Sequence, residues 1–233
     1  KDKSFKHFIL SSCEMNITNH ILTEIEPLRL DSSIKSAKKL FKNYPLTHFP
    51  VLEDNKLLGS FAEDDIRIIE DEKGKLAVYA YLLSSFFADE KATVLELLKI
   101  FADNDTNIIP VLNEEKNYLG YYDLRDVLDV FSTSPFMTEV SETLIVKKNE
   151  NDFSMSEVAQ IVEMNKGKLL GAYISEKSDE FMHITLKTVS SNINEMMHTF
   201  RRYNYEIIST HENDIYLEDL KNRSEYLQKY LEM

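Results

Sequence analysis

The sequence of 233 residues is poor in several residues on which common kinds of site depend. It has a single cysteine, which excludes an intramolecular disulfide and a zinc site of the CxxC type. Its five glycines form no glycine-rich phosphate loop. The histidines show no metal-ligand spacing with one another or with acids, and Cys13 has no evident histidine partner for nucleophilic catalysis. We therefore assign no catalytic residues and no metal site, and we expect a protein that is not an enzyme.

Positive charge and long apolar runs are also scarce. Lys and Arg number 27 against 40 Asp and Glu, which gives a formal net charge of -13. Because no basic field exists to neutralise phosphates, this balance argues against binding to nucleic acid or to an anionic membrane. The longest apolar runs are far too short to span a bilayer, and residues 8–10 are too short for the apolar part of a secretory signal. With the single cysteine, these features predict a reduced, cytoplasmic compartment.

An internal repeat organises the first part of the chain. Each copy contains an apolar-Pro-Val-Leu strand, a polar turn, a second strand with a glycine, and an acidic helix start. The equivalent pairs are Pro50 and Pro110, Gly59 and Gly120, and Asp65 and Asp126. Apolar residues at helical spacing follow Ser33 in the first copy and Thr93 in the second, and both residue types favour a helix start. Each copy therefore predicts the order helix, strand, hairpin, strand, helix.

A further helix is expected before each copy. The first covers residues 16–26, ends at Pro27, and is followed by a short strand at 28–30. Its counterpart is the nearly uncharged stretch 76–87, whose apolar side chains, Val78 among them, would pack between the two copies.

A different pattern follows a linker at residues 132–135. It predicts strands at 143–146, 169–174, 181–189 and 205–210, and helices at 154–166 and 192–204. The resulting order β-α-β-β-α-β is the ferredoxin-like arrangement. A terminal helix is expected over 216–233, and residues 1–15 are expected to be an N-terminal extension. The fold class is therefore α/β, of the α+β kind.

The repeated motif resembles the CBS domain family, named after cystathionine β-synthase. The family pattern, Gly-apolar-apolar-Ser/Thr-x-x-Asp-apolar, corresponds to residues 59–66 and 120–127. The resemblance implies a tandem CBS pair, also called a Bateman module, with pseudo-twofold symmetry between domains at 16–73 and 74–134.

The ferredoxin-like unit over 140–215 resembles an ACT domain, a small ligand-sensing and dimerising module. The whole order is similar to that of CBS–ACT proteins of the acetoin-utilisation B type.

The CBS resemblance also implies ligands and site residues. It implies an adenosine-type ligand, either an adenine nucleotide or S-adenosylmethionine, in clefts between the repeats. Asp65 and Asp126 would accept hydrogen bonds from ribose hydroxyls. Ala62 and Asp123 occupy the positions where the family carries a phosphate-contacting Ser or Thr, and Asp123 would repel a phosphate at about 5 Å by roughly 1–3 kcal/mol. The other ligand-binding candidates are His48, Pro50, Ile108, Pro110 and Arg125.

Two functional alternatives stay open. In the first, the chain is a regulatory protein that senses an adenosine-type ligand. In the second, Asp65 and Asp126 only cap helices, the clefts are empty, and the protein is a scaffold that binds a protein partner. In either case we expect a homodimer formed through helices 76–87 and 94–101.

Overall fold

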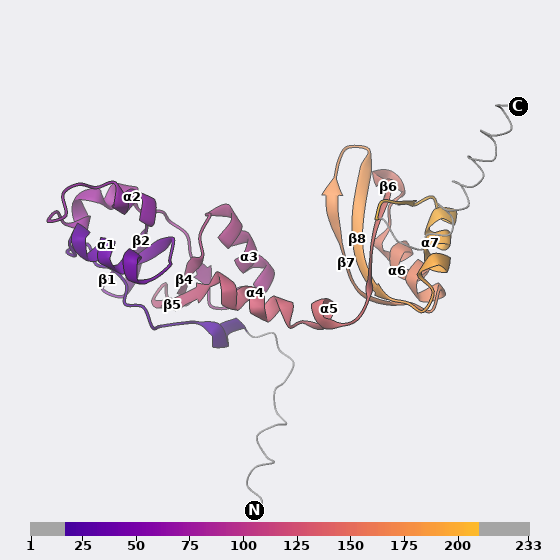
Figure 1. The fold of residues 1–233 in the computed structure, drawn as a ribbon, viewed down its shortest axis with the longest axis horizontal. Coiled ribbons are helices and arrows are strands. Elements are labelled where there is room, and N and C mark those ends of the chain that lie inside the picture. The colour runs from indigo at the N-terminus through magenta and orange to yellow at the C-terminus, as the bar shows by residue number, and fades with distance from the viewer. Residues whose placement is uncertain (1–16, 210–233) are drawn as a thin grey trace, which may run out of the picture. The chain divides into compact units, whose positions relative to one another are not determined.

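The computed structural model of the protein describes residues 17–209 and contains two compact units that divide between Thr133 and Ser134 (Figure 1). Both units combine helices and sheets, so the expected α+β class is confirmed. Within the described residues, no helix is long and apolar enough to cross a membrane. The predicted N-terminal extension and terminal helix lie outside the described residues.

The first unit contains both copies of the repeat. Its first copy has η1 (Ile17–His20), α1 (Ile34–Asn43), β1 (His48–Glu53), β2 (Lys56–Ala62) and α2 (Glu63–Arg67). Its second copy has η2 (Leu76–Leu82), β3 (Ala88–Asp89), α3 (Val94–Asp103), β4 (Ile108–Leu112), β5 (Tyr118–Asp123) and α4 (Leu124–Ser132). The order helix, hairpin, helix therefore occurs twice, as the repeat predicts.

Capping explains where the long helix of each copy begins. The Ser33 side chain accepts a hydrogen bond from the backbone N–H of Ser36 at the start of α1. At the start of α3, Thr93 and Glu96 form a reciprocal capping box. Both caps satisfy backbone donors that lack an intrahelical partner.

The two hairpins have the same register. Pro50 lies opposite Ser60 in the β1–β2 pair, and Pro110 lies opposite Tyr121 in the β4–β5 pair. Both registers shift at the Val-Leu step that follows the proline. Since alternate side chains point to opposite faces, one face of each hairpin packs on its own helix. The other face is turned toward neighbouring chain segments.

The helices predicted at 16–26 and 76–87 are wrong. Each stretch forms only a short 3-10 helix and then becomes extended. Leu22 exchanges two backbone hydrogen bonds with Tyr121 of β5, at 2.8 and 2.9 Å. Ser84 exchanges two with Ser60 of β2, both at 2.9 Å. These sheet bonds use backbone groups that a helix would need internally, and Val78, expected between the copies, is 67% exposed.

Each copy therefore completes the sheet of the other. The segment before the first copy pairs with β5, and the segment before the second copy pairs with β2. Gly59 and Gly120 permit this close pairing, because a Cβ on Gly59 would lie 2.9 Å from the Ser84 carbonyl oxygen and one on Gly120 would lie 2.3 Å from that of Leu22. Their φ angles of +148° and +151° also favour glycine.

Thr47 and Asn107 join the two copies by reciprocal hydrogen bonds. The Thr47 backbone N–H donates to Asn107 Oδ1 at 2.9 Å, and the Asn107 backbone N–H donates to Thr47 Oγ1 at 3.0 Å. Their carbonyl groups accept from Glu63 and Leu124, the first residues of α2 and α4. Equivalent residues making equivalent bonds across the pair give the unit the pseudo-twofold symmetry that the repeat implies.

The hydrophobic cores also cross between the copies. One buried cluster combines residues of the first copy, such as Phe49 and Phe61, with Ile108 and Tyr121 of the second. The other contains the core of the second copy together with Ile17. Since burial of apolar surface is the main source of stability, neither copy has a complete core alone.

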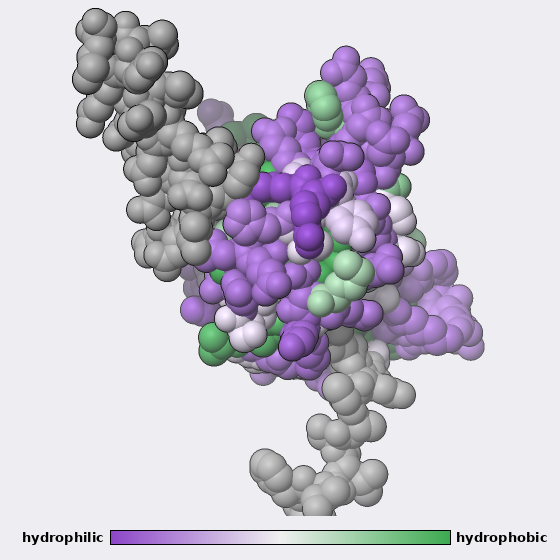
Figure 2. Space-filling view, turned by 90° about the vertical axis from the view of Figure 1, so that its right-hand side faces the viewer, coloured by the Kyte–Doolittle hydropathy of each residue, from purple (hydrophilic) through white to green (hydrophobic). Residues whose placement is uncertain are grey.

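The second unit has the ferredoxin-like order. Its elements are α5 (Pro135–Thr138), β6 (Glu142–Asn149), η3 (Glu150–Asp152), α6 (Met155–Met164), β7 (Lys168–Lys177), β8 (Phe181–Val189), α7 (Ile193–Arg202) and β9 (Glu206–Ile207). The strands lie in the order β7-β8-β6-β9. Helices α6 and α7 pack on one face of this sheet over a buried cluster (Figure 1). Most of the surface seen in Figure 2 is hydrophilic, as amphipathic helices with outward polar faces predict.

The opposite face of this sheet carries the short helix α5. A Cβ on Gly171 would lie 2.8 Å from the Phe136 ring, so the ring occupies the space that a side chain would take. The Lys187 ammonium donates to the Met137 carbonyl at 3.1 Å and lies over the Phe136 ring. The sequence after the linker is therefore fixed on the sheet of its own unit.

Candidate functional site

One face of the first hairpin gathers most of the candidate residues of the first copy. His48 lies opposite Ala62, and Pro50 lies opposite Ser60, so these four side chains share a face. Phe86 joins them from the extended segment that pairs with β2, and its ring meets that of His48 edge-on at 5.2 Å. We call this set, together with Asp65, the first site: His48, Pro50, Ser60, Ala62, Asp65 and Phe86.

The first site contains two buried polar side chains. Burial lowers the pKa of His48 below its ordinary value of 6.5, although the Asp65 and Asp105 carboxylates act in the opposite direction. His48 Nδ1 lies 3.0 Å from Thr47 Oγ1. The Ser60 hydroxyl is buried and has no hydrogen-bond partner within residues 17–209. An unpaired buried hydroxyl is uncommon and requires an explanation.

The equivalent face of the second hairpin has different chemistry. Ile108 lies opposite Asp123, and Pro110 lies opposite Tyr121. Glu24 follows Leu22 by two residues, as Phe86 follows Ser84 in the first site. We call this set, together with Asp126, the second site: Glu24, Ile108, Pro110, Tyr121, Asp123 and Asp126.

Burial and nearby carboxylates both act on the pKa of the tyrosine of the second site. Burial raises the pKa of Tyr121 to about 12, and the carboxylates of Glu24, Asp123 and Asp126 add to the rise, as does Tyr44. The first site has one carboxylate, Asp65, at its equivalent positions. The pseudo-symmetric sites therefore differ in charge.

Neither Asp65 nor Asp126 caps its helix. The N-cap of α2 is Ala62, which offers no side-chain bond, and the N-cap of α4 is Asp123, whose carboxylate accepts the Arg125 N–H at 2.8 Å. Asp65 and Asp126 lie three residues after the N-cap, in the first turn, and are half-buried. Within residues 17–209, neither carboxylate has a hydrogen bond or ion pair. The capping alternative is thus wrong for these two residues, and it applies to Asp123.

The two arginines near the helix starts lie at the surface. Arg67 pairs with Asp64 at 2.7 Å, and both side chains are largely exposed. Arg125 is exposed on α4, and its backbone N–H serves the Asp123 cap. Its backbone therefore lies at the start of α4 beside the second site, and its role in ligand binding stays a prediction.

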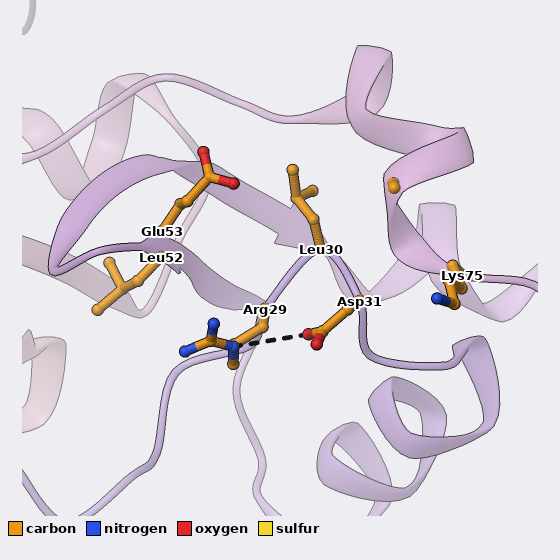
Figure 3. Close-up of a pocket in the computed structure, with 7 residues that line it drawn as sticks. Arg29, Leu30, Asp31, Leu52, Glu53 and Lys75 are labelled. Atoms are coloured by element: carbon orange, nitrogen blue, oxygen red, sulfur yellow. Dashed lines mark ion pairs between the residues drawn. The ribbon is translucent and has the colours of Figure 1, made fainter.

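Two surface pockets of the first unit lie away from these residues. One, of about 390 Å³, is lined by Arg29, Leu30, Asp31, Leu52, Glu53, Lys75 and Ala77. Figure 3 shows the Arg29–Asp31 ion pair, 3.6 Å long, at its rim. The other, of about 430 Å³, lies between residues 87–92 and helix α3. Neither pocket contains a predicted site residue.

Within residues 17–209, no group of three or more His, Cys, Asp or Glu side chains could hold a metal ion. The three carboxylates of the second site are therefore not arranged as the ligands of a metal.

Sequence reasoning missed Ser60, Tyr121, Phe86 and Glu24. The first two follow directly from strand alternation, since they lie opposite the two prolines on the same face. Phe86 and Glu24 come from segments predicted as helices, so their place beside the hairpins was hidden. Aligning the copies residue by residue, with Glu24 against Phe86, would have found both.

The comparison with known families identifies the repeats. The CBS domain family matches residues 20–72 and 83–133. These residues form a pair of CBS domains, in agreement with the motif and with the pseudo-twofold arrangement of the hairpins. The matched residues include both sites, with their prolines and first-turn aspartates.

Individual relatives are distant. An uncharacterised protein of Methanocaldococcus jannaschii is 21% identical over 154 residues, which are 65% of this chain and 57% of the relative. The chain therefore spans little more than half the length of that relative.

Among solved structures, a CBS domain pair/ACT domain protein of Thermotoga maritima has a TM-score of 0.45 at 16% identity, covering 50% of this chain and 95% of that one. The CBS domain of a bacterial CNNM/CorC family Mg²⁺ transporter, solved in complex with ATP, has a TM-score of 0.42 at 18% identity, covering 49% of this chain and 85% of that one.

Proposed function

We propose that this chain is a non-enzymatic regulatory protein whose CBS pair binds an adenosine-type ligand at the first site. The observation that supports it best is the state of Asp65: a half-buried carboxylate in the first helical turn, without a hydrogen bond or ion pair within residues 17–209. A carboxylate accepts two hydroxyl groups at once, which suits the vicinal hydroxyls of a ribose.

The remaining residues of the first site suit the base and the sugar. Phe86 and His48 offer aromatic surface against which an adenine ring can pack. The Ser60 hydroxyl is an unused donor and acceptor beside them. Ala62 offers no hydrogen bond to a phosphate, so we expect the nucleoside part to supply most of the affinity. S-adenosylmethionine and the adenine nucleotides share that part.

Regulation would follow from the exchange of segments between the copies. Phe86 precedes the second repeat in the chain but contributes to the first site. A ligand held there contacts elements of both domains, and its differential affinity shifts the equilibrium between their relative orientations. The Thr47–Asn107 junction is one of the hydrogen-bonded links between the copies that such a shift would strain.

Assembly and further sensing belong to the same proposal. Val78 and Tyr81 on η2 and Leu95 on α3 are apolar and 67–79% exposed, which favours a homodimer through these helices. Light scattering at micromolar concentration should give twice the chain mass, and a Tyr81→Lys, Leu95→Lys double variant should give one. We also assign an ACT-like sensing role to residues 140–215, a cytoplasmic location, and an unidentified protein target.

The proposal is tested by calorimetric titration of the chain with AMP and adenosine. We expect saturable binding that Asp65→Asn weakens about tenfold, since a hydrogen bond to a charged group contributes about 1.5–3 kcal/mol. Asp54→Asn is the matched control, because it removes the same charge from an exposed turn with positive φ, which asparagine tolerates. A thermal-shift screen with ATP, with and without Mg²⁺, and S-adenosylmethionine would extend the series. Binding by none of these compounds would favour the scaffold alternative, with a protein partner on the exposed helices.

A further inference from the structure

The sheet of the second unit has one face that is only partly covered. Helices α6 and α7 bury Met182, Ile184 and Leu186 of β8 on one side, so the residues between these three point to the other side. On that side, the short helix α5 covers the row formed by Gly171 and Lys187. The rest of that side is at least partly exposed within residues 17–209, and we call it the open face.

Apolar side chains from all four strands meet on the open face. Ile145 of β6 lies opposite Thr185 of β8, which lies opposite Tyr173 of β7, so the three side chains share the face. Ile208 follows β9 directly and lies beside Ile145, because its backbone N–H donates to the Ile145 carbonyl at 2.8 Å. Tyr173 is 54% exposed, Ile208 39% and Phe181, on the same face, 38%. Such an exposed apolar patch marks a contact surface.

The charged groups on the open face already pair with one another. Lys147 lies 3.2 Å from the Glu206 carboxylate and over the Phe181 ring. The His183 ring lies 2.8 Å from the Glu176 carboxylate. The open face therefore presents no field of one sign to a polyion, and an apolar surface is the occupant that it fits.

The described part of the chain ends beside this face. The Ile145 N–H donates to the Ser209 hydroxyl at 3.1 Å, which fastens the last described residue to the middle of the apolar row. Residues 210–233 continue from that point. The helix predicted over 216–233 carries four leucines on one side: Leu217, Leu220, Leu227 and Leu231. An 18-residue helix is about 27 Å long, whereas four strands span about 15 Å.

We propose that residues 216–233 lie as an amphipathic helix across the open face, with the leucine side on Ile145, Tyr173 and Ile208. Residues 210–215 can reach about 20 Å when extended, which lets the chain turn back from Ser209 onto the sheet. Attachment at Ser209 also gives the helix a high effective concentration at the face, an advantage that a separate molecule lacks. A partner that needs the open face must first displace this helix. The inference does not depend on the ligand of the first site.

The test is thiol labelling of the full chain carrying Cys13→Ser, which removes the single cysteine, and Tyr173→Cys, which places a thiol on the open face. The docked helix would cover this thiol, so labelling would occur only while the helix is displaced. The variant Leu220→Glu, Leu227→Glu puts charge on the leucine side. We expect it to raise the labelling rate about tenfold, because it increases the displaced population.

The matched control is Asn222→Glu, Lys229→Gln. It changes the net charge by the same amount as the leucine variant, but on the opposite side of the predicted helix. We expect it to leave the labelling rate unchanged. Equal rates in the leucine variant and the control overturn the inference.

Oxidative cross-linking of the Cys13→Ser chain is the second measurement. We expect Tyr173→Cys with Leu220→Cys or Leu227→Cys to form a disulfide within one chain, which migrates as a monomer on a non-reducing gel. Tyr173→Cys with Asn222→Cys should cross-link about tenfold more slowly, because that side of the helix faces away. A cross-link that joins two chains would mean that a second copy covers the face, and it would overturn the inference, as would cross-linking at equal rates from both sides of the helix.

Discussion

The junction between the two CBS domains provides the sharpest test of the fold, and Asn107→Ala is the change that probes it. The Asn107 side chain accepts from the Thr47 N–H at 2.9 Å and from the Thr47 hydroxyl at 3.1 Å, and it donates to the Pro45 carbonyl at 2.8 Å. At about 1 kcal/mol for each of these bonds, alanine should cost about 3 kcal/mol. That is a large fraction of the 5–15 kcal/mol by which a typical domain is stable.

The assay is urea unfolding followed by circular dichroism, with the midpoint and the slope fitted separately. Asn104→Ala is the matched control, since it removes an amide whose side chain donates one hydrogen bond, to the Ile100 carbonyl at 2.8 Å, within the second copy. We expect it to cost about 1 kcal/mol, with an unchanged slope in both variants. If the two alanine variants cost the same, the Thr47–Asn107 junction does not hold the pair together and the reasoning is refuted.

Three further predictions concern strain, protonation and a half-buried ion pair. Gly120→Ala should destabilise the first unit by more than about 2 kcal/mol in the same assay, because a Cβ there meets the Leu22 carbonyl at 2.3 Å with φ at +151°; a cost below about 0.5 kcal/mol would contradict the pairing. Because the pKa of His48 is lowered in the folded protein, the free energy of unfolding should fall as the pH drops from about 6.5 toward that pKa. His48→Gln should remove this part of the pH dependence, and identical pH profiles of the two proteins would contradict the prediction. Lys148→Met should destabilise the second unit by about 2–3 kcal/mol, since Glu157 would keep a half-buried charge without its partner; full stability at neutral pH would argue that the pair contributes nothing.

The motif and the periodicity were sufficient to predict the hairpins and the helices that follow them. Pro50 and Pro110 lie at matched positions of paired strands, as the repeat predicts. Ser33 and Thr93 cap the helices they were expected to cap. These features depend on local chemistry, and local chemistry is what a single sequence displays.

The segments before each copy could not be predicted in the same way. Residues around Leu22 and Ser84 have apolar patterns compatible with a helix. Leu22 nevertheless pairs with Tyr121, about one hundred residues further along the chain, and Ser84 pairs with Ser60, 24 residues earlier. Their conformation is set by a partner distant in sequence, and tertiary context overrides propensity at such places. The same error concealed Phe86 and Glu24 as site residues, whereas Asp65 and Asp126 were found because the motif itself contains them.

The two copies are similar on the hairpin face that packs on their own helix and differ on the opposite face. Positions that face each copy's own helix are apolar in both: Phe49 and Ile109, Val51 and Val111, Phe61 and Tyr122, Ile66 and Val127. Positions on the opposite face differ in kind: His48 and Ile108, Ser60 and Tyr121, Ala62 and Asp123, Phe86 and Glu24. A core requires only apolar volume of the right shape, so both copies meet the same demand. If the residues on the opposite face served packing alone, the same demand for apolar volume would apply to them. In the second copy, Ile108 and Tyr121 meet it, since both belong to a buried apolar cluster. In the first copy, the buried Ser60 hydroxyl without a hydrogen-bond partner within residues 17–209 costs stability and does not improve packing. Such a cost is expected where a residue serves a ligand, so the first copy is the one whose opposite face we expect to bind.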